Sequence, residues 1–209
     1  MSAVPSIRCF LSMASPWAYL GHAEFLAIAR RHRASVEFAP VPLRRLFPET
    51  GGLPLPKRHP VRQRYRLVEL QRWRAHRQLP LNLEPKGAPV EPEPLDRVVI
   101  AIQSAGHDPD AFMRRVFAAY WAEDRDLGDR SLIERLLSEA GLPPEPLDHS
   151  ESPEIRAAYE VNFADAMRIG IFGAPSYVLN GEVFWGQDRL PLLDEALATG
   201  RPPFRPESS

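Results

Sequence analysis

Residues 6–20 read S-I-R-C-F-L-S-M-A-S-P-W-A-Y-L, and they decide the first part of the fold. Residues 6–10 are rich in apolar side chains and predict a strand. Ser15, followed by proline, is typical of a helix N-cap with proline at the first helical position, and it predicts a helix over 16–32. Residues 35–41 alternate apolar and polar side chains and predict a second strand. This order predicts a parallel strand pair with a right-handed crossover.

The end of the chain shows a second strand-rich pattern, which begins after Gly170. The predicted elements are a strand at 176–179, a hairpin turn at Asn180-Gly181, a return strand at 182–185 and a helix at 190–199. The Asn-Gly dipeptide is the strongest short hairpin signal. The chain therefore predicts two antiparallel strands followed by a closing helix.

The middle of the chain is mainly helical in its pattern. Residues 42–60 hold five prolines and two glycines, which predicts an ordered loop without regular elements. Helices are predicted at 61–78, at 95–105, and after the caps Asp108, Asp129 and Ser152, with an irregular proline-rich stretch at 80–94.

Together the outer pieces form the thioredoxin arrangement, so the sequence predicts an α/β, thioredoxin-like fold with a large all-helical insertion. Residues 1–56 and 169–209 form the two parts of the thioredoxin-like domain in this prediction, and residues 57–168 form the inserted helical domain. A cleft between the two parts is the expected place for a small ligand.

The composition excludes several classes of function. The chain has 26 basic and 27 acidic residues, a net charge of −1, so we expect no nucleic-acid partner. Its single cysteine, Cys9, allows no internal disulfide, CxxC pair or zinc cluster, and we read it as a buried apolar residue of the first strand. The six histidines show no metal spacing, so no metal is expected. With no apolar run near the roughly 18 residues of a membrane span and no signal-peptide pattern, we expect a cytoplasmic protein without membrane attachment.

Ser15 lies where a thioredoxin-like protein carries its reactive cysteine, at a helix N-terminus that favours an anion. Disulfide exchange needs a sulfur nucleophile, and Ser15-Pro16-Trp17-Ala18 has none. The Ser15 hydroxyl is suited to donate a hydrogen bond to a sulfur brought in by a ligand. The alternative interpretation is that Ser15 is only an N-cap.

Two further segments carry candidate binding groups. Pro175 is a candidate cis-proline, and the backbone of Ala174 would then pair with an extended peptide ligand; a trans turn proline is the alternative. In the segment Trp185-Gly186-Gln187-Asp188, either Gln187 or Asp188 is placed to cap the last helix. Asp188 is equally suited to receive the ammonium of an α-amino acid.

Eight basic residues lie between residues 57 and 77, opposed only by Glu69. Three interpretations remain open: a solvated face, a nucleic-acid patch that the balanced net charge disfavours, or a cleft rim that attracts a small carboxylate. In the third interpretation Lys57 and Arg58 lie nearest the proline-rich loop.

These motifs resemble the 2-hydroxychromene-2-carboxylate isomerase family, within the DsbA-like and kappa-class glutathione transferase group, over nearly the whole chain. The matching motifs are S-P-W-A-Y-L at 15–20, G-I-F-G-A-P at 170–175, N-G-E at 180–182 and F-W-G-Q-D-R-L at 184–190. Tyr65, Glu69, Arg72, Trp73 and L-P-L at 79–81 also resemble the family's first inserted helix and the following turn. The chain departs from the family at Ser12, where aspartate is usual, and at Gly51-Gly52-Leu53, where Gly-Asn is common.

The resemblance implies a dimeric, glutathione-dependent enzyme. Ser15 would hold the glutathione sulfur as the catalytic serine, and Ala174, before cis-Pro175, would pair with the cysteinyl backbone. The γ-glutamyl end would be held by Trp185, Gly186, Gln187 and Asp188. Lys57 and Arg58 fall where family members contact the aromatic carboxylate substrate.

The leading functional hypothesis is therefore glutathione-dependent cis–trans isomerisation of 2-hydroxychromene-2-carboxylate or a related aromatic carboxylate, with the glutathione thiolate stabilised by Ser15. One alternative is a kappa-like glutathione transferase or peroxidase that acts on another electrophile. The other is a non-catalytic thioredoxin-fold module that retains only peptide pairing beside Pro175.

Overall fold

The computed structural model describes residues 4–86 and 91–206. Its sheet has four strands in the order β2-β1-β3-β4. The strands are β1 (Ser6–Leu11), β2 (Ser35–Pro40), β3 (Ser176–Leu179) and β4 (Glu182–Trp185). β1 and β2 are parallel, with Cys9 opposite Phe38, whereas β3 is antiparallel to both β1 and β4. The sheet is therefore mixed, as a βαβ unit followed by a β-hairpin requires.

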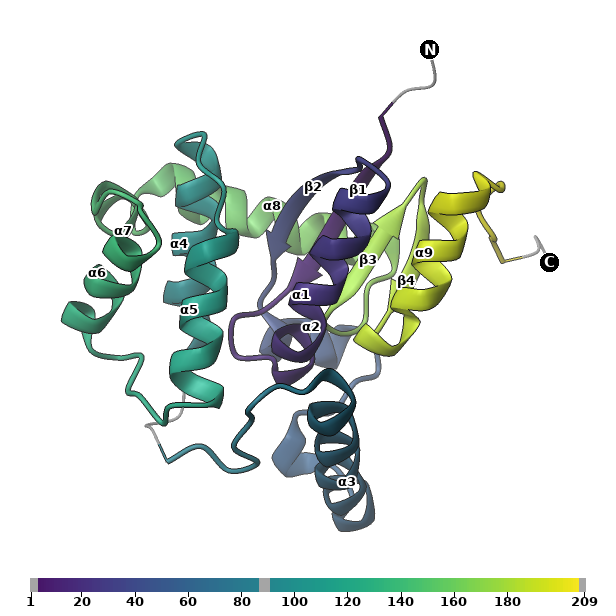
Figure 1. The fold of residues 1–209 in the computed structure, drawn as a ribbon, viewed down its shortest axis with the longest axis horizontal. Coiled ribbons are helices and arrows are strands. Elements are labelled where there is room, and N and C mark those ends of the chain that lie inside the picture. The colour runs from purple at the N-terminus through teal and green to yellow at the C-terminus, as the bar shows by residue number, and fades with distance from the viewer. Residues whose placement is uncertain (1–3, 87–90, 207–209) are drawn as a thin grey trace.

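Helices cover both faces of the sheet. The helices are α1 (Pro16–Arg31), α2 (Leu43–Glu49), α3 (Pro60–Arg77), α4 (Pro92–Ser104), α5 (Asp110–Trp121), α6 (Arg130–Glu139), α7 (Glu145–His149), α8 (Pro153–Ile169) and α9 (Leu190–Thr199), with short 3-10 helices η1 (Leu55–Lys57) and η2 (Gln187–Arg189). In Figure 1, α1 and α9 lie in front of the sheet and α8 passes behind it. The group α4 to α7 lies to one side, and α3 projects below.

Side chains of β1 alternate between the two faces, as the period of a strand dictates. Cys9 and Leu11 belong to the large buried cluster with α1, and Phe10 belongs to a smaller one with Ala166 of α8. The large cluster also includes Phe117 of α5, so the inserted helices and the sheet share one core. The predicted domain boundaries after residues 56 and 168 stay a prediction.

Most predicted elements are present, and the fold is the α/β, thioredoxin-like one with a helical insertion that the sequence predicts. The caps Ser15, Asp129 and Ser152 each accept a hydrogen bond from a backbone N–H in the first turn of their helix. Asn180 and Gly181 both have positive φ, at 52° and 82°, as a two-residue hairpin loop needs.

The prediction that residues 42–60 form no regular element is wrong. They hold both α2 and η1, because the prolines fall where a short helix tolerates them. Pro42 is the N-cap of α2, and Pro48 lies in its last turn, where it removes one backbone donor close to the end of the helix. Leu46 of α2 is completely buried beside Phe10, and this packing stabilises the helix. Of the irregular stretch predicted at 80–94, residues 87–90 lie outside the described residues, and α4 begins within it at Pro92.

Candidate functional site

Ser15 lies at the junction of β1 and α1, where its side chain caps the helix. Its Oγ accepts a hydrogen bond from the Ala18 N–H at 3.2 Å, and its own N–H donates to the Ser12 carbonyl at 3.0 Å. Ser15 is 6% exposed, and α1 carries no acidic residue in its first turn. The positive end of the helix is therefore not neutralised locally, which favours an anion beside this hydroxyl.

The loop before β3 faces Ser15. The Ala174–Pro175 peptide bond is cis, so the trans alternative is wrong. Ser15 Oγ donates a hydrogen bond to the Ala174 carbonyl across 3.4 Å, which joins residues 159 positions apart in the sequence. A bond of that length is weak, so the hydroxyl proton is readily redirected to a stronger acceptor.

The segment after β4 is held against the same loop. Gly186 donates its N–H to the Pro175 carbonyl at 2.8 Å. Trp185 is half exposed, and its ring lies edge-on to the exposed Phe172 with centroids 4.6 Å apart. Gly173 allows the Trp185 ring to approach the backbone, because a Cβ there would lie 2.4 Å from Trp185 Nε1 and displace the ring. Ser15, Ala174–Pro175 and Trp185–Gly186 therefore form one continuous neighbourhood.

Gln187 and Asp188 lie in η2, and neither caps α9. The N-cap of α9 is Arg189, which makes no side-chain capping bond, so that part of the sequence interpretation is wrong. The reason is that Gln187 and Asp188 belong to η2, which leaves Arg189 as the residue directly before α9. Asp188 pairs with Arg189 at 2.6 Å. Because Asp188 is exposed, its carboxylate is still accessible to a ligand ammonium.

Gln187 is almost completely buried and is held from two sides. Arg77, at the end of α3, donates to Gln187 Oε1 from Nε at 3.3 Å and from Nη2 at 3.1 Å. On the other side α1 approaches so closely that a Cβ on Gly21 would lie 2.5 Å from the Gln187 Cβ. The Gln187 side chain thus positions this segment, and its predicted contact with glutathione stays a prediction.

Lys57 is the last residue of η1 and Arg58 follows it, next to the start of α3. Lys57 is exposed, while Arg58 is half-buried and donates from Nε to the Leu53 carbonyl at 2.7 Å. Within residues 4–86 and 91–206, neither side chain has a hydrogen bond, ion pair or cation–π contact to Ser15, Ala174 or the 185–188 segment. Their predicted contact with substrate stays a prediction.

Two other members of the basic group at 57–77, Arg62 and Arg66, lie close to Arg58. Burial and the nearby Arg62 lower the pKa of Arg58, and burial and Arg58 lower the pKa of Arg66. Among the described residues none of these three arginines has an ion-pair partner. Arg62 and Arg66 lie one turn apart on α3, and Arg58 lies just before this helix begins. The four-residue spacing of the three arginines was the signal in the sequence. Such a group without carboxylates is suited to an anion.

Cys9 does not supply a nucleophile. It is 3% exposed, and burial raises the pKa of its thiol far above the usual range. The interpretation of Cys9 as a buried apolar residue is confirmed. Any sulfur chemistry at Ser15 therefore needs a thiol from a ligand.

The described residues hold neither a candidate metal cluster nor a candidate membrane-spanning helix. Residues 4–86 and 91–206 contain no group of three or more His, Cys, Asp or Glu side chains placed to hold a metal ion. No helix in the same residues is both long enough and apolar enough to cross a membrane.

Comparison with known proteins defines the class first. The model of the DSBA-like thioredoxin domain matches residues 6–198, and the chain belongs to this family. The chain is also 25% identical over 195 residues to a 2-hydroxychromene-2-carboxylate isomerase of Sphingobium xenophagum, covering 92% of this chain and 97% of that protein. The family resemblance read from the sequence is thereby confirmed.

Solved structures agree with the fold. A 2-hydroxychromene-2-carboxylate isomerase superposes with a TM-score of 0.74 at 23% identity, covering 93% of this chain and 95% of the other. A probable DsbA oxidoreductase from Streptomyces coelicolor superposes with a TM-score of 0.75 at 17% identity, covering 96% and 93%. At these identities the superpositions establish the fold alone.

Proposed function

We propose that this protein is a glutathione-dependent cis–trans isomerase of 2-hydroxychromene-2-carboxylate or a related aromatic carboxylate. The observation that carries the proposal is the Ser15 hydroxyl, which lies at the start of α1 and 3.4 Å from the Ala174 carbonyl. The only cysteine of the chain, Cys9, is buried. Curated relatives over about nine-tenths of the chain are named as this isomerase.

The residues of the site fit glutathione as a cofactor. The tripeptide has a thiol, peptide groups and an α-amino acid end. Ser15 and the positive end of α1 suit the thiolate, the Ala174 backbone suits a peptide group, and the exposed Asp188 suits the ammonium. Trp185, Gly186 and Gln187 complete the γ-glutamyl side in this proposal.

When bound, glutathione supplies a thiolate that adds to the electron-poor double bond of the substrate and leaves after rotation. The protein's part is to keep that sulfur ionised at neutral pH. Ser15 does so by turning its proton from the weak bond with Ala174 toward the sulfur, and the helix N-terminus adds its positive field. Each unit by which the thiol pKa is lowered corresponds to about 1.4 kcal/mol.

Lys57 and Arg58 are proposed to bind the substrate carboxylate. Both cations lack a carboxylate partner among the described residues, so a substrate anion would not have to displace one. We further propose that the protein acts as a homodimer in the cytoplasm, where the reducing environment maintains glutathione as a thiol.

The test is to mix the protein with glutathione, record the thiolate absorbance, and then add a chromene carboxylate and identify the product. A thiolate band together with the trans-o-hydroxybenzylidenepyruvate type of product supports the isomerase. A thiolate band without isomerisation indicates a transferase or peroxidase acting on another electrophile. Absence of the band indicates a non-catalytic peptide-binding module and overturns the proposal.

A further inference from the structure

A buried carboxyl group contacts the backbone two residues before Ser15. Asp96 of α4 is 0% exposed. Its Oδ1 accepts the Met13 N–H at 2.7 Å, and its Oδ2 accepts the Tyr159 hydroxyl of α8 at 3.0 Å. Asp96 thus joins two inserted helices to the loop between β1 and α1.

That loop is the turn that carries Ser15. Ser15 N–H bonds back to the Ser12 carbonyl, so Met13 is one of the two residues enclosed by the turn. The Met13 N–H and the Ser12 carbonyl belong to the same planar peptide group, so fixing the Met13 amide also fixes the carbonyl that accepts the Ser15 N–H. The direction in which Ser15 leaves the turn follows from that plane.

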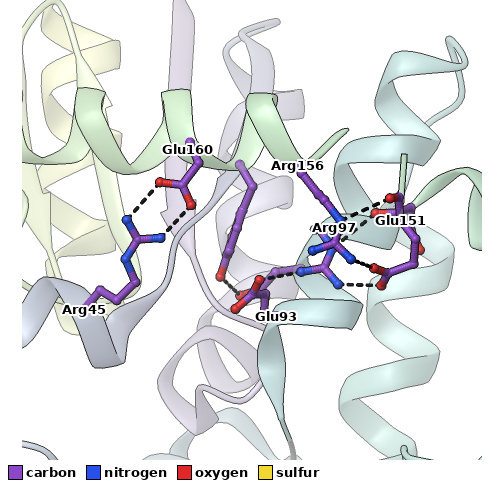
Figure 2. Close-up of polar contacts among 9 residues, drawn as sticks. Arg45, Glu93, Arg97, Glu151, Arg156 and Glu160 are labelled. Carbon is purple, nitrogen blue, oxygen red and sulfur yellow. Dashed lines mark hydrogen bonds and ion pairs between the residues drawn. The ribbon is translucent and has the colours of Figure 1, made fainter. Parts of the chain in front are cut away.

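Within the described part of the chain no cation pairs with Asp96, although an arginine follows it in sequence. Figure 2 shows that Arg97 turns instead to Glu93 and Glu151, and it also donates to the Ser150 carbonyl. Figure 2 also shows the ion pairs of Arg156 with Glu151 and of Arg45 with Glu160, so these two arginines are paired with glutamates as well.

The environment of Asp96 favours its protonated form. Burial raises the pKa of Asp96 to about 8, against hydrogen bonds from Met13 and Tyr159 that favour the ionised form, while Glu93 adds to the rise. Ser12 Oγ makes no hydrogen bond of ordinary geometry in the described part of the chain, yet it lies close enough to favour ionisation. The groups that face Asp96 are therefore Ser12, Met13, Tyr159 and Glu93.

We infer that Asp96 is a positioning residue for Ser15: by accepting the Met13 N–H, it holds the turn so that the Ser15 hydroxyl points at the ligand sulfur. The inference rests on the proposed function for its effect on turnover. The link from Asp96 to the turn does not depend on that function, since it is already present without a ligand.

A generic structural role would make Tyr159 as important as Asp96, because both are buried in the same contact. The positioning role separates them, since only Asp96 contacts the turn. It also predicts that asparagine rescues, because an amide oxygen still accepts the Met13 N–H.

The experiment compares Asp96→Ala, Asp96→Asn and the control Tyr159→Phe. With glutathione and a chromene carboxylate, Asp96→Ala is expected to lower kcat about tenfold or more with KM nearly unchanged, as loss of one contact to an ionisable group does. Asp96→Asn and Tyr159→Phe are expected to stay within about threefold of the parent protein. Equal losses in Asp96→Ala and Tyr159→Phe, or none in Asp96→Ala, would overturn the inference.

A second readout needs neither ligand nor turnover. In the ligand-free protein, the NMR shifts of the Met13 and Ser15 amides are followed against pH. Both are expected to move together with a midpoint near pH 8, and neither should move in Asp96→Asn. If Ser15 does not follow Met13, the turn is not coupled to Asp96 and the inference fails, even if Asp96→Ala does not fold. If both amides respond but glutathione gives no thiolate band, the proposed function fails and the positioning role stands.

Discussion

Arg77 joins the inserted helices to the candidate site, and Arg77→Met should both destabilise the protein and loosen that site. The arginine bridges the end of α3 to the buried Gln187 of η2 and to Glu24 of α1. Its guanidinium also lies 5.4 Å from the Trp73 ring centroid. Methionine retains an apolar stem and removes the guanidinium, with its donors, its charge and its contact with the Trp73 ring.

The loss of stability in Arg77→Met depends on how deeply each partner of Arg77 is buried once its hydrogen bonds are removed. Gln187 Oε1 loses two donors at 3.1 and 3.3 Å, and an unsatisfied buried acceptor costs about 1–3 kcal/mol. The Glu24 pair is 3.3 Å long and its carboxylate side chain is 40% exposed, so it adds about 0–1 kcal/mol. Loss of the contact with the Trp73 ring adds about 0.5–1 kcal/mol. We expect a total loss of about 1.5–5 kcal/mol, which corresponds to a fall in Tm of about 3–20 °C for a chain of this size.

Urea unfolding of the parent protein and Arg77→Met measures the loss directly, and calorimetry with glutathione measures the effect on the site. The matched control is Arg64→Met, an exposed arginine of the same helix, which should stay within about 0.5 kcal/mol. If Arg77→Met is no less stable than Arg64→Met, the contact between α3 and η2 does not stabilise the fold.

Three further outcomes are expected. Asp188→Ala should weaken glutathione binding by about 1.5–3 kcal/mol through loss of a charge-assisted contact, and equal affinity in calorimetry would remove Asp188 from the site. Replacing Lys57 and Arg58 by alanine should raise KM for the carboxylate substrate in steady-state assays, and a collapse of glutathione affinity would contradict their assignment. The contribution of Asp96 to the free energy of unfolding should fall as pH rises from about 4 to about 8, because folded Asp96 keeps its proton to about pH 8 whereas an unfolded aspartate loses it near 3.8. Urea titrations over that range should lose this component of the slope in Asp96→Asn.

Local signals determined how much of the fold the sequence could predict. Ser15, Asp129 and Asn180-Gly181 act on their own immediate backbone, so their residue types alone indicated two helix starts and a hairpin. The helix α2 was missed because its proline content argues against a helix, and the burial of Leu46 that stabilises it depends on distant residues.

The candidate site was predictable only in part, for the same reason. Motif resemblance indicated Ser15, Ala174 and the 185–188 segment, and the structure brings them together through backbone contacts. Asp96 and Arg77 could not be found in this way. Their importance lies in partners 83 and 110 positions away, and nothing in their local sequence marks those contacts.

The most direct test of the central claim is a pH titration of thiolate absorbance for the glutathione complex of the parent protein and of Ser15→Ala. Ser15→Ala should keep the fold, since a lost N-cap costs only about 0.5–2 kcal/mol, and it should still bind glutathione through Ala174 and Asp188. We expect its titration midpoint to move to higher pH and most turnover at neutral pH to be lost. An unchanged midpoint and an unchanged rate would show that Ser15 is only a helix cap, and the proposed mechanism would be wrong.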